Sequence, residues 1–564
     1  MKQIQKKSLK QTRVAAPKKP TATPPKRSKL RLPALAVFFL LTWLWASWYY
    51  GSVFHVGREY SFWVADPRIM NFVLCQPYGI LRYIGRAMLQ LYKYPWLGGL
   101  LLASMLTAGS WLLGYVSESL KVKSKEMSTA LSYIVRAGQY VPALAYVAVV
   151  TYRGLDTFFE ARTGFIFGIP FVALVILCIW AVIIRSFKLR RRRSPASLQG
   201  EEPRTESQGT LQSETKTLLP LFASFSTILF IVLSFAAIVA FDQWKRPYVR
   251  VICQLLDMEY RQDWAGIQKL ARANATMSNR PMACSYAISL VQTEQIGERL
   301  YDIRLDYDSL YIHGMDGRHN NASCLYVAEG NYYGGFIEPS MHACMEQMVM
   351  TGPTVRLLKL LTKCALMREE WDLAEKYLTL LRRVPFEGDF IEKYSPMVRR
   401  IDLVNADREM AMIRLTEPLH DSYESQYQQP LFMGYNLMLV EGRSKEALIN
   451  SLCVCLYTKL MPQFVERLEP LVGTTPPSII MDGIMLAENK NPGISQHFTG
   501  LDFRRSRMQN FFQNTQQYMK DRPGFAYELF PKYKGYYPYY YFFGNLKATK
   551  KGYTSLSSSN SGVN

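Results

Sequence analysis

Long uncharged runs of apolar residues alternate with charged segments along the N-terminal part of the chain. The runs cover 32–54, 94–116, 140–152, 165–184 and 218–241, and none of them contains Asp, Glu, Lys or Arg. A helix that crosses a membrane needs about 20 apolar residues, and the run at 140–152 is shorter than that. The pattern predicts a transmembrane bundle of about five helices over residues 32–241.

Residues 242–546 show a different pattern, in which apolar positions recur at helical spacing within short segments bounded by Gly and Pro. The segments RQDWAGIQKL at 261–270 and REEWDLAEKYL at 368–378 resemble each other. The second fits the small and large positions of a tetratricopeptide repeat. The sequence therefore predicts an all-α protein, with the bundle followed by a tetratricopeptide-like α-solenoid. The predicted repeat core includes Trp264, Trp371, Ala374 and Leu378.

Both ends of the chain lack the apolar surface that a folded core requires. Residues 1–31 are rich in Lys, Pro and Thr and contain no acidic residue, and residues 547–564 are rich in Ser and Asn. We expect both to be disordered tails. The aromatic block GYYPYYYFFGN at 535–545 indicates either a carbohydrate or membrane contact or a terminal helix that caps the solenoid. The capping helix is the favoured interpretation.

The excess positive charge lies beside the predicted spans. The chain has a formal net charge of +22, of which residues 1–31 carry +11, residues 117–139 carry +2 and the loop 185–217 carries +4. Lys and Arg next to a span resist translocation, so these three segments are predicted to be cytoplasmic and the domain after the last span periplasmic. The loop begins with a polybasic stretch that also suits contact with anionic lipids. It contains Arg185, Lys188, Arg190, Arg191, Arg192 and Arg193.

The large C-terminal region is nearly neutral, with 37 basic and 35 acidic residues from position 242 onward. A nucleic-acid-binding protein carries excess positive charge on its folded binding surface, where it neutralises phosphates. This charge distribution therefore argues against a nucleic-acid partner.

A short amphipathic segment lies between the first two spans, at residues 76–99. Its apolar residues recur at helical spacing, while Arg82, Arg86 and Lys93 occupy other positions. We expect a helix at the membrane interface with these basic residues near the headgroups. A helix that simply packs on the bundle is an equally acceptable interpretation.

The same segment resembles a known family. The order Gln-Pro, Gly79, Tyr83, Gly85, Leu89 and Gln90, followed by Pro95, Leu97 and Gly98, is similar to the signature of an uncharacterised family of multi-pass membrane proteins from Bacteroidota. That family usually has two glycines where this chain has Tyr78 and Gly79. The resemblance implies a bacterial inner-membrane protein with a helical repeat region and implies no activity.

One segment, at 311–324, has the residue types most typical of a catalytic or metal site. In YIHGMDGRHNNASC, His313, Asp316 and His319 are weak candidate metal ligands, but their spacing matches no established zinc pattern. The favoured interpretation is a polar loop between helix pairs. The seven cysteines after residue 242 include four on apolar helical faces, and an odd number leaves at least one thiol without a disulfide partner inside the chain.

These features favour a non-enzymatic inner-membrane anchor that presents a periplasmic helical-repeat scaffold to a protein or envelope-glycan partner. The alternative is an accessory subunit or enzyme that handles or transports a lipid-linked envelope substrate. A charged or His-rich cluster at the membrane interface would favour the alternative, and the sequence offers His55, Arg58 and Glu59 there. No cofactor and no catalytic residue is predicted, and the expected partners are membrane lipid and a protein bound to the solenoid.

Overall fold

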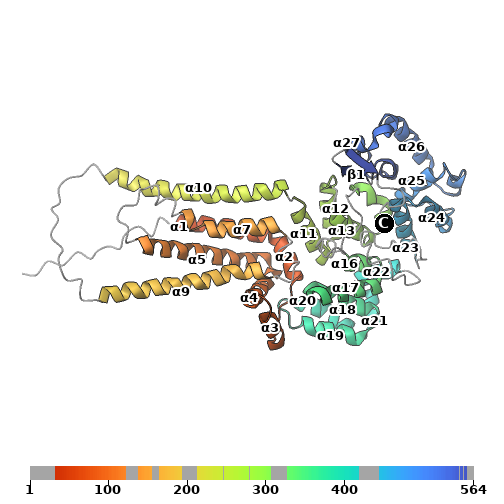
Figure 1. Ribbon diagram of the computed structural model, residues 1–564. Coiled ribbons are helices and arrows are strands. Elements are labelled where there is room, and N and C mark those ends of the chain that lie inside the picture. Colours follow the sequence, from red (N-terminus) through yellow and green to blue (C-terminus); the bar gives the residue numbers. More distant parts are fainter. Residues whose placement is uncertain are drawn as a thin grey trace, which may run out of the picture.

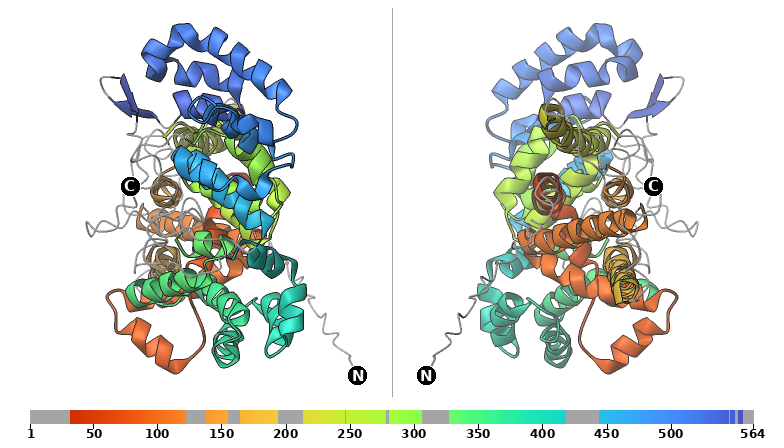
Figure 2. Two further views of the ribbon diagram at one scale, coloured as in Figure 1. Left: turned by 90° about the vertical axis from the view of Figure 1, so that its right-hand side faces the viewer. Right: turned by 90° about the vertical axis from the view of Figure 1, so that its left-hand side faces the viewer.

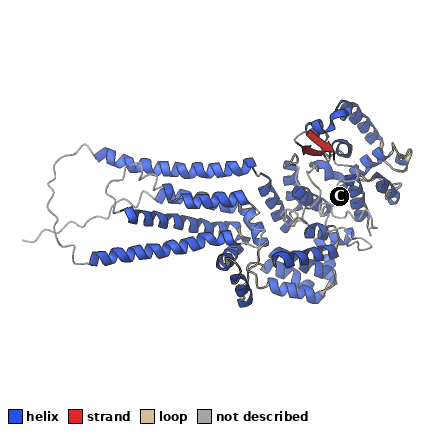
Figure 3. Cartoon of the chain, viewed as in Figure 1, coloured by secondary structure: helices blue, strands red, loops and turns tan. Residues whose placement is uncertain are grey.

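The computed structural model contains a bundle of long helices with a domain of shorter helices at one end (Figures 1 and 3). Figure 2 views the molecule along the length of the bundle, with the domain facing the reader on the left and the bundle facing the reader on the right. The structure describes residues 32–121, 137–154, 164–193, 213–245, 247–277, 280–305, 327–417, 444–544, 546–549 and 552–555.

The bundle consists of five helical segments that follow the predicted apolar runs. They are α1 (Leu32–Leu44) with its π-helical extension η2 (Trp45–Tyr49), α5 (Pro95–Lys121), α7 (Val141–Arg153), α9 (Phe165–Arg193) and α10 (Ser213–Lys245). Four stretches in them are long and apolar enough to cross a membrane, namely Leu32–Tyr49, Pro95–Ser119, Phe165–Phe187 and Phe225–Lys245. The shorter α7 packs against α5 and α10. Large apolar side chains such as Trp180 and Val182 are exposed on the outside of the bundle, as expected for surfaces that face lipid.

Helix α9 does not end where its apolar run ends. It continues through the polybasic stretch to Arg193, and α10 begins at Ser213, so the loop predicted at 185–217 starts later and ends earlier. Lys and Arg are good helix formers, which allows the helix to extend beyond the apolar residues.

A lateral helix pair, α3 (Pro67–Leu74) and α4 (Gly79–Leu89), connects α2 (Gly51–Glu59) to α5 through the 3-10 helix η3 (Gln90–Lys93). Helix α4 packs against the start of α9 with almost no space between the two backbones. A methyl group added at Gly85 would overlap the carbonyl oxygen of Gly164 and the amide of Gly168. The contact therefore requires glycine at position 85.

The domain is built from helices and 3-10 turns, with one short strand pair near the C-terminus. Its elements are α11 (Pro247–Tyr260), α12 (Trp264–Ala273), α13 (Arg280–Val291), α14 (Ile296–Arg299), η5 (Leu300–Asp302), α16 (Val327–Tyr333), α17 (Ile337–Thr351), α18 (Val355–Met367), α19 (Trp371–Leu381), α20 (Gly388–Tyr394), η6 (Ser395–Met397), α21 (Ile401–Ala406), α22 (Arg408–Thr416), α23 (Lys445–Thr458), α24 (Met461–Glu466), η8 (Glu469–Leu471), α25 (Ser478–Ala487), η9 (Ile494–His497), α26 (Asp502–Thr515), η10 (Gln516–Asp521), α27 (Arg522–Tyr533), α28 (Tyr537–Phe543), β1 (Leu546–Thr549) and β2 (Gly552–Ser555). The two strands are antiparallel, with Leu546 opposite Ser555, in a segment where the sequence pattern indicated a disordered tail.

The same turn joins the two helices of five pairs: α11 and α12, α13 and α14, α16 and α17, α18 and α19, and α23 and α24. In each, a residue with positive φ follows the first helix, and the next amide donates to a carbonyl five residues earlier, which is the Schellman motif. The positive-φ residues are Gln262, Glu294, Gly335, Glu369 and Lys459, and the amides of Asp263, Gln295, Phe336, Glu370 and Leu460 donate over 2.8 to 2.9 Å. The similarity between RQDW and REEW thus reflects an identical helix-to-helix turn.

The predicted repeat core is only partly buried. Ala374 and Leu378 are fully buried, whereas Trp371 is half-buried and packs against the edge of the core. Trp264 is also half-buried, with its ring 5.6 Å from that of Tyr333. The two tryptophans therefore cover the core, and Ala374 and Leu378 fill it.

We expect Leu378→Ala to destabilise the domain more than Trp371→Ala. The first change creates a cavity among rigid neighbours and should cost about 2 to 5 kcal/mol. The second removes a side chain that stays partly in water and should cost about 1 to 2 kcal/mol. Thermal unfolding of the full chain in detergent measures both, with the exposed Lys376→Ala as the control that changes little. Equal losses from the two core variants would contradict the observed burial.

The C-terminal aromatic block forms α28 and packs against α23. The hydroxyl groups of Tyr537 and Tyr540 donate to the carbonyl oxygens of Leu456 (2.9 Å) and Tyr457 (3.0 Å). Their rings are buried, which agrees with a helix that closes the end of the domain.

Candidate functional site at the junction of bundle and domain

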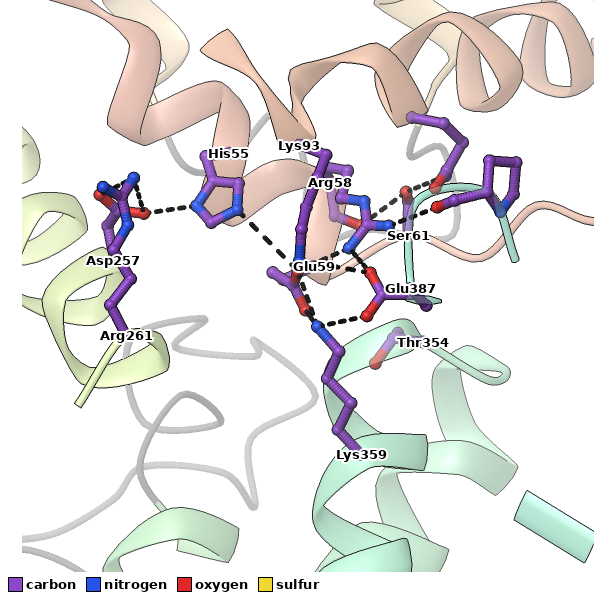
Figure 4. A network of polar contacts seen from close by, with 12 residues as sticks. His55, Arg58, Glu59, Ser61, Lys93, Asp257, Arg261, Thr354, Lys359 and Glu387 are labelled. Carbon is purple, nitrogen blue, oxygen red and sulfur yellow. Dashed lines mark hydrogen bonds and ion pairs between the residues drawn. The ribbon is translucent and has the colours of Figure 1, made fainter. Parts of the chain in front are cut away.

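A cluster of buried charged side chains lies where the bundle meets the domain (Figure 4). Helix α2 supplies Arg58 and Glu59, η3 supplies Lys93, α18 supplies Lys359, and Glu387 precedes α20. Arg58, Glu59 and Glu387 are at most 2% exposed. We call these five residues the junction cluster. It joins segments that are about 300 positions apart in the chain.

Arg58 is the central cation of the junction cluster. Its Nη1 lies 2.6 Å from Glu59 Oε1 and also contacts Glu387 Oε1, while Nη2 donates to the carbonyl oxygen of Pro385 over 2.9 Å. Burial alone would lower the pKa of Arg58, but the two carboxylates raise it above its ordinary value. Arg58 lies on α2, which directly follows the first bundle helix, and its partners Glu387 and Pro385 belong to the domain. Arg58 therefore connects both parts.

Lys359 bridges the same two carboxylates from the domain side. Its Nζ lies 3.0 Å from Glu59 Oε2 and 2.9 Å from Glu387 Oε2, and Lys93 Nζ lies 3.8 Å from Glu387 Oε1. Burial would raise the pKa of Glu59, but the attraction of Lys359 and Arg58 outweighs it and lowers that pKa below its usual range. The cluster therefore holds Glu59 as a carboxylate.

His55 extends the cluster from α2 to α11. Its Nδ1 lies 2.5 Å from Asp257 Oδ1 and its Nε2 lies 4.0 Å from Glu59 Oε1. Asp257 also pairs with Arg261 over 2.8 Å. Helix α2 is thus fixed to two different parts of the domain.

The basic side chains of α18 continue this pattern into the domain interior. Arg356, Lys359 and Lys363 follow helical spacing along one face. Arg356 pairs with Glu329, and Lys363 Nζ lies 2.8 Å from Glu409 Oε1. One buried face of α18 therefore binds carboxylates from α2, α16, α22 and the segment before α20.

A buried carboxyl group, Glu259, lies near this face. Burial and the neighbouring charge of Glu329 raise the pKa of Glu259 to about 8, so the group is largely protonated near neutral pH. Ser285 donates a hydrogen bond to it over 3.3 Å. A neutral Glu259 is compatible with the dense packing of acidic groups around α18.

The junction cluster has the geometry of a structural connection. Its arginine and two lysines each contact a carboxylate of the cluster. In the part of the chain that the structure describes, no three His, Cys, Asp or Glu side chains are placed to hold a metal ion. The candidate ligands His313, Asp316 and His319 lie outside the described residues.

The basic residues of the amphipathic segment are buried or half-buried within the protein. Arg82 is 6% exposed, and its Nη1 donates to Gln76. Arg86 is half-buried, and burial followed by repulsion from Arg82 lowers its pKa to about 10. Lys93 belongs to the junction cluster. The structure thus uses α4 as a packing helix, because its glycine face is pressed against α9.

Of the junction cluster, the sequence pointed to Arg58 and Glu59, next to His55, as charged groups at the membrane interface, and to Lys93 in the amphipathic segment. It did not point to Lys359 and Glu387. Lys359 has the signal of a cation on an otherwise apolar helix, at helical spacing from two other basic residues. Glu387 sits in a turn and carries no such signal.

The six cysteines of the domain that the structure describes are buried, and none of these six forms a disulfide bond. They are Cys253, Cys284, Cys344, Cys364, Cys453 and Cys455. Burial raises the pKa of Cys364 to about 12, so this thiol behaves as a small core residue.

Comparison with known proteins gives one family. A family of unknown function, DUF6057, matches residues 26–194 and 141–544. No curated protein and no solved structure matches the chain significantly. Because the matched ranges cover most of its length, the chain belongs to this family.

The structure gives a physical reason for the glycines in the sequence signature. A methyl group at Gly79 would overlap the backbone of Leu74, and one at Gly98 would overlap the ring of Tyr92. Tyr78, directly before Gly79 in this signature, has φ of 60° in the left-handed region. Glycine adopts this conformation without steric cost.

Proposed function

We propose that this protein is a multi-pass anchor of the bacterial inner membrane that holds a helical-repeat domain in a fixed position at the periplasmic surface. There the domain serves as a scaffold for a protein or envelope-glycan partner. The observation that carries this proposal is the junction cluster. Removing two carboxylates from water is costly, and the cluster offsets that cost only when bundle and domain are docked.

The recurring Schellman turn supports a repeat architecture for the domain. Five helix pairs share this turn, and the pair α18 and α19 places small Ala374 and large Leu378 as a tetratricopeptide-like repeat does. Stacked helix pairs give a continuous surface suited to an extended partner.

The orientation of the anchor follows from its charges. The polybasic stretch at the end of α9 resists translocation, which places the domain, one span later, on the other side of the membrane. We therefore expect a reporter that is active only in the cytoplasm to work when fused after Gly200 and to fail when fused after Asn564. The reverse pattern would contradict the proposed topology. Neutral replacements of Arg190 to Arg193 should scramble the orientation of α9 and α10.

A second candidate function is the handling of a lipid-linked envelope substrate, either as an enzyme or as an accessory subunit. The junction cluster alone does not favour it, because its carboxylates already pair with the neighbouring cations. The observation that favours it is an apolar cavity between α7 and α10.

A further inference from the structure

A cavity of about 390 Å³ opens between the end of α7 and the end of α10. The two helices lie side by side in the bundle (Figure 1). Ala148 and Thr151 line the cavity from α7, and Ala237, Ile238 and Phe241 line it from α10. The Thr151 hydroxyl donates to Val147 within its own helix over 2.8 Å, so the wall offers a ligand mainly apolar contact.

The end of this cavity nearest the domain is polar and cationic. Asp242 lies there, but Tyr49 donates to its carboxylate over 2.9 Å and Arg250 approaches it to 3.4 Å. Lys245 lines the same end, is exposed, and is placed over the ring of Trp244 at 4.1 Å. Because Arg250 balances the negative charge of Asp242, Lys245 gives this end a positive charge.

The position of the cavity along α10 matches the edge of a bilayer. Lys245 ends the apolar stretch Phe225–Lys245, and Trp244 beside it is 73% exposed. Tryptophan and lysine are typical of the level at which headgroups lie. If one acyl chain of a phospholipid lies in the cavity, the phosphate of that lipid would therefore lie at the level of Lys245.

We infer that this cavity binds one acyl chain of an anionic phospholipid, with Lys245 holding the phosphate. The inference rests on the proposed placement of the bundle in a membrane and adds a specific lipid site to it. Charge complementarity selects the lipid class: an apolar wall with a cation at its mouth matches an acyl chain that ends in an anionic headgroup. A lipid-linked envelope substrate shares this chemistry.

Native mass spectrometry of the full chain in mild detergent tests the site, with phosphatidylglycerol and phosphatidylethanolamine as the added probes. The wild type should retain phosphatidylglycerol about fivefold better than phosphatidylethanolamine. This ratio corresponds to about 1 kcal/mol for the interaction of one lysine with an anionic headgroup. Lys245→Gln should abolish this preference. Ala237→Phe should fill the cavity and abolish retention of both lipids. The matched control is Ala173→Phe on α9, also at an exposed alanine of an apolar helix, and it should behave as the wild type.

The outcomes separate this inference from the proposed function. If carbonate extraction removes the wild type from membranes, the membrane placement is wrong and the lipid site fails with it. If the protein stays in the membrane but Ala237→Phe retains phosphatidylglycerol as the wild type does, only the lipid site is overturned. Equal retention of the two lipids by the wild type would overturn the role of Lys245.

Discussion

Arg58→Met should destabilise the protein by about 3 to 5 kcal/mol, the cost typical of removing one partner from a buried ion pair. The variant leaves Glu59 and Glu387, both nearly inaccessible to water, with Lys359 and the more distant Lys93 as their remaining cations. Methionine has similar length and fills much of the space, so the loss reflects charge more than volume. Thermal unfolding of the full chain in detergent measures this loss, and we expect a lower unfolding temperature for the variant.

The matched control is Arg399→Met. Arg399 pairs with Asp372 over 3.0 Å, but the two side chains are 72% and 94% exposed. Solvent screens such a pair, and its loss should cost about 0 to 1 kcal/mol. If both variants unfold at the same temperature, the junction cluster does not stabilise the docked arrangement.

Gly85→Ala should destabilise the bundle by about 1 to 3 kcal/mol, the range for overpacking a close contact. The added methyl group would overlap the carbonyl oxygen of Gly164, which is backbone and has no rotamer through which to move away. Helix α4 must then separate from α9, and the apolar contacts between them are lost with it.

Gly109→Ala is the control with the opposite expected sign. Gly109 lies in the middle of α5, and a methyl group there meets no atom within 4 Å. Alanine in a helix is favoured over glycine by roughly 0.5 to 1 kcal/mol, so this variant should unfold at the same temperature or slightly higher. A loss of stability in both variants would mean that the cost at Gly85 comes from helix geometry in general and not from the contact with α9.

The helices of the bundle were predictable because hydropathy is a local property. The four later apolar runs each lie almost entirely in one helix, while the first run, 32–54, is divided at Tyr50 between α1 with η2 and α2. Four helical stretches are of sufficient length to cross a membrane. The end of α9 was less predictable, because the helix propensity of Lys and Arg lets it continue beyond the apolar run. The fully buried Ala374 and Leu378 were also evident from the repeat pattern, whereas the exposed side of Trp371 depends on which helices pack next to it.

The candidate site was predictable only in part. His55, Arg58 and Glu59 stand out as charged residues directly after an apolar run, but their partners come from distant segments. The contact of Arg58 with Pro385 spans 327 positions, and no local pattern specifies such a pairing. Gly85 stood out because it belongs to the signature of the family that the sequence resembles. Only the structure shows why glycine is needed there, because a larger residue would overlap the backbone at the start of α9.

Cross-linking in whole cells tests most directly the proposal that the domain is docked on the bundle in the periplasm. Asp66 Oδ2 and Arg383 Nη1 form an ion pair of 2.9 Å between the segment after α2 and the domain. With cysteine at both positions and the exposed Cys75 changed to Ser, a membrane-impermeant bis-maleimide should alkylate both thiols and so join them in cells with a permeabilised outer membrane. A protease site after Gly200, cleaved after solubilisation, then reports the cross-link as two fragments that still migrate together. The account predicts this joined species when the reagent is added to cells whose inner membrane is still closed, and a cross-link that forms only after lysis, or not at all, would contradict it.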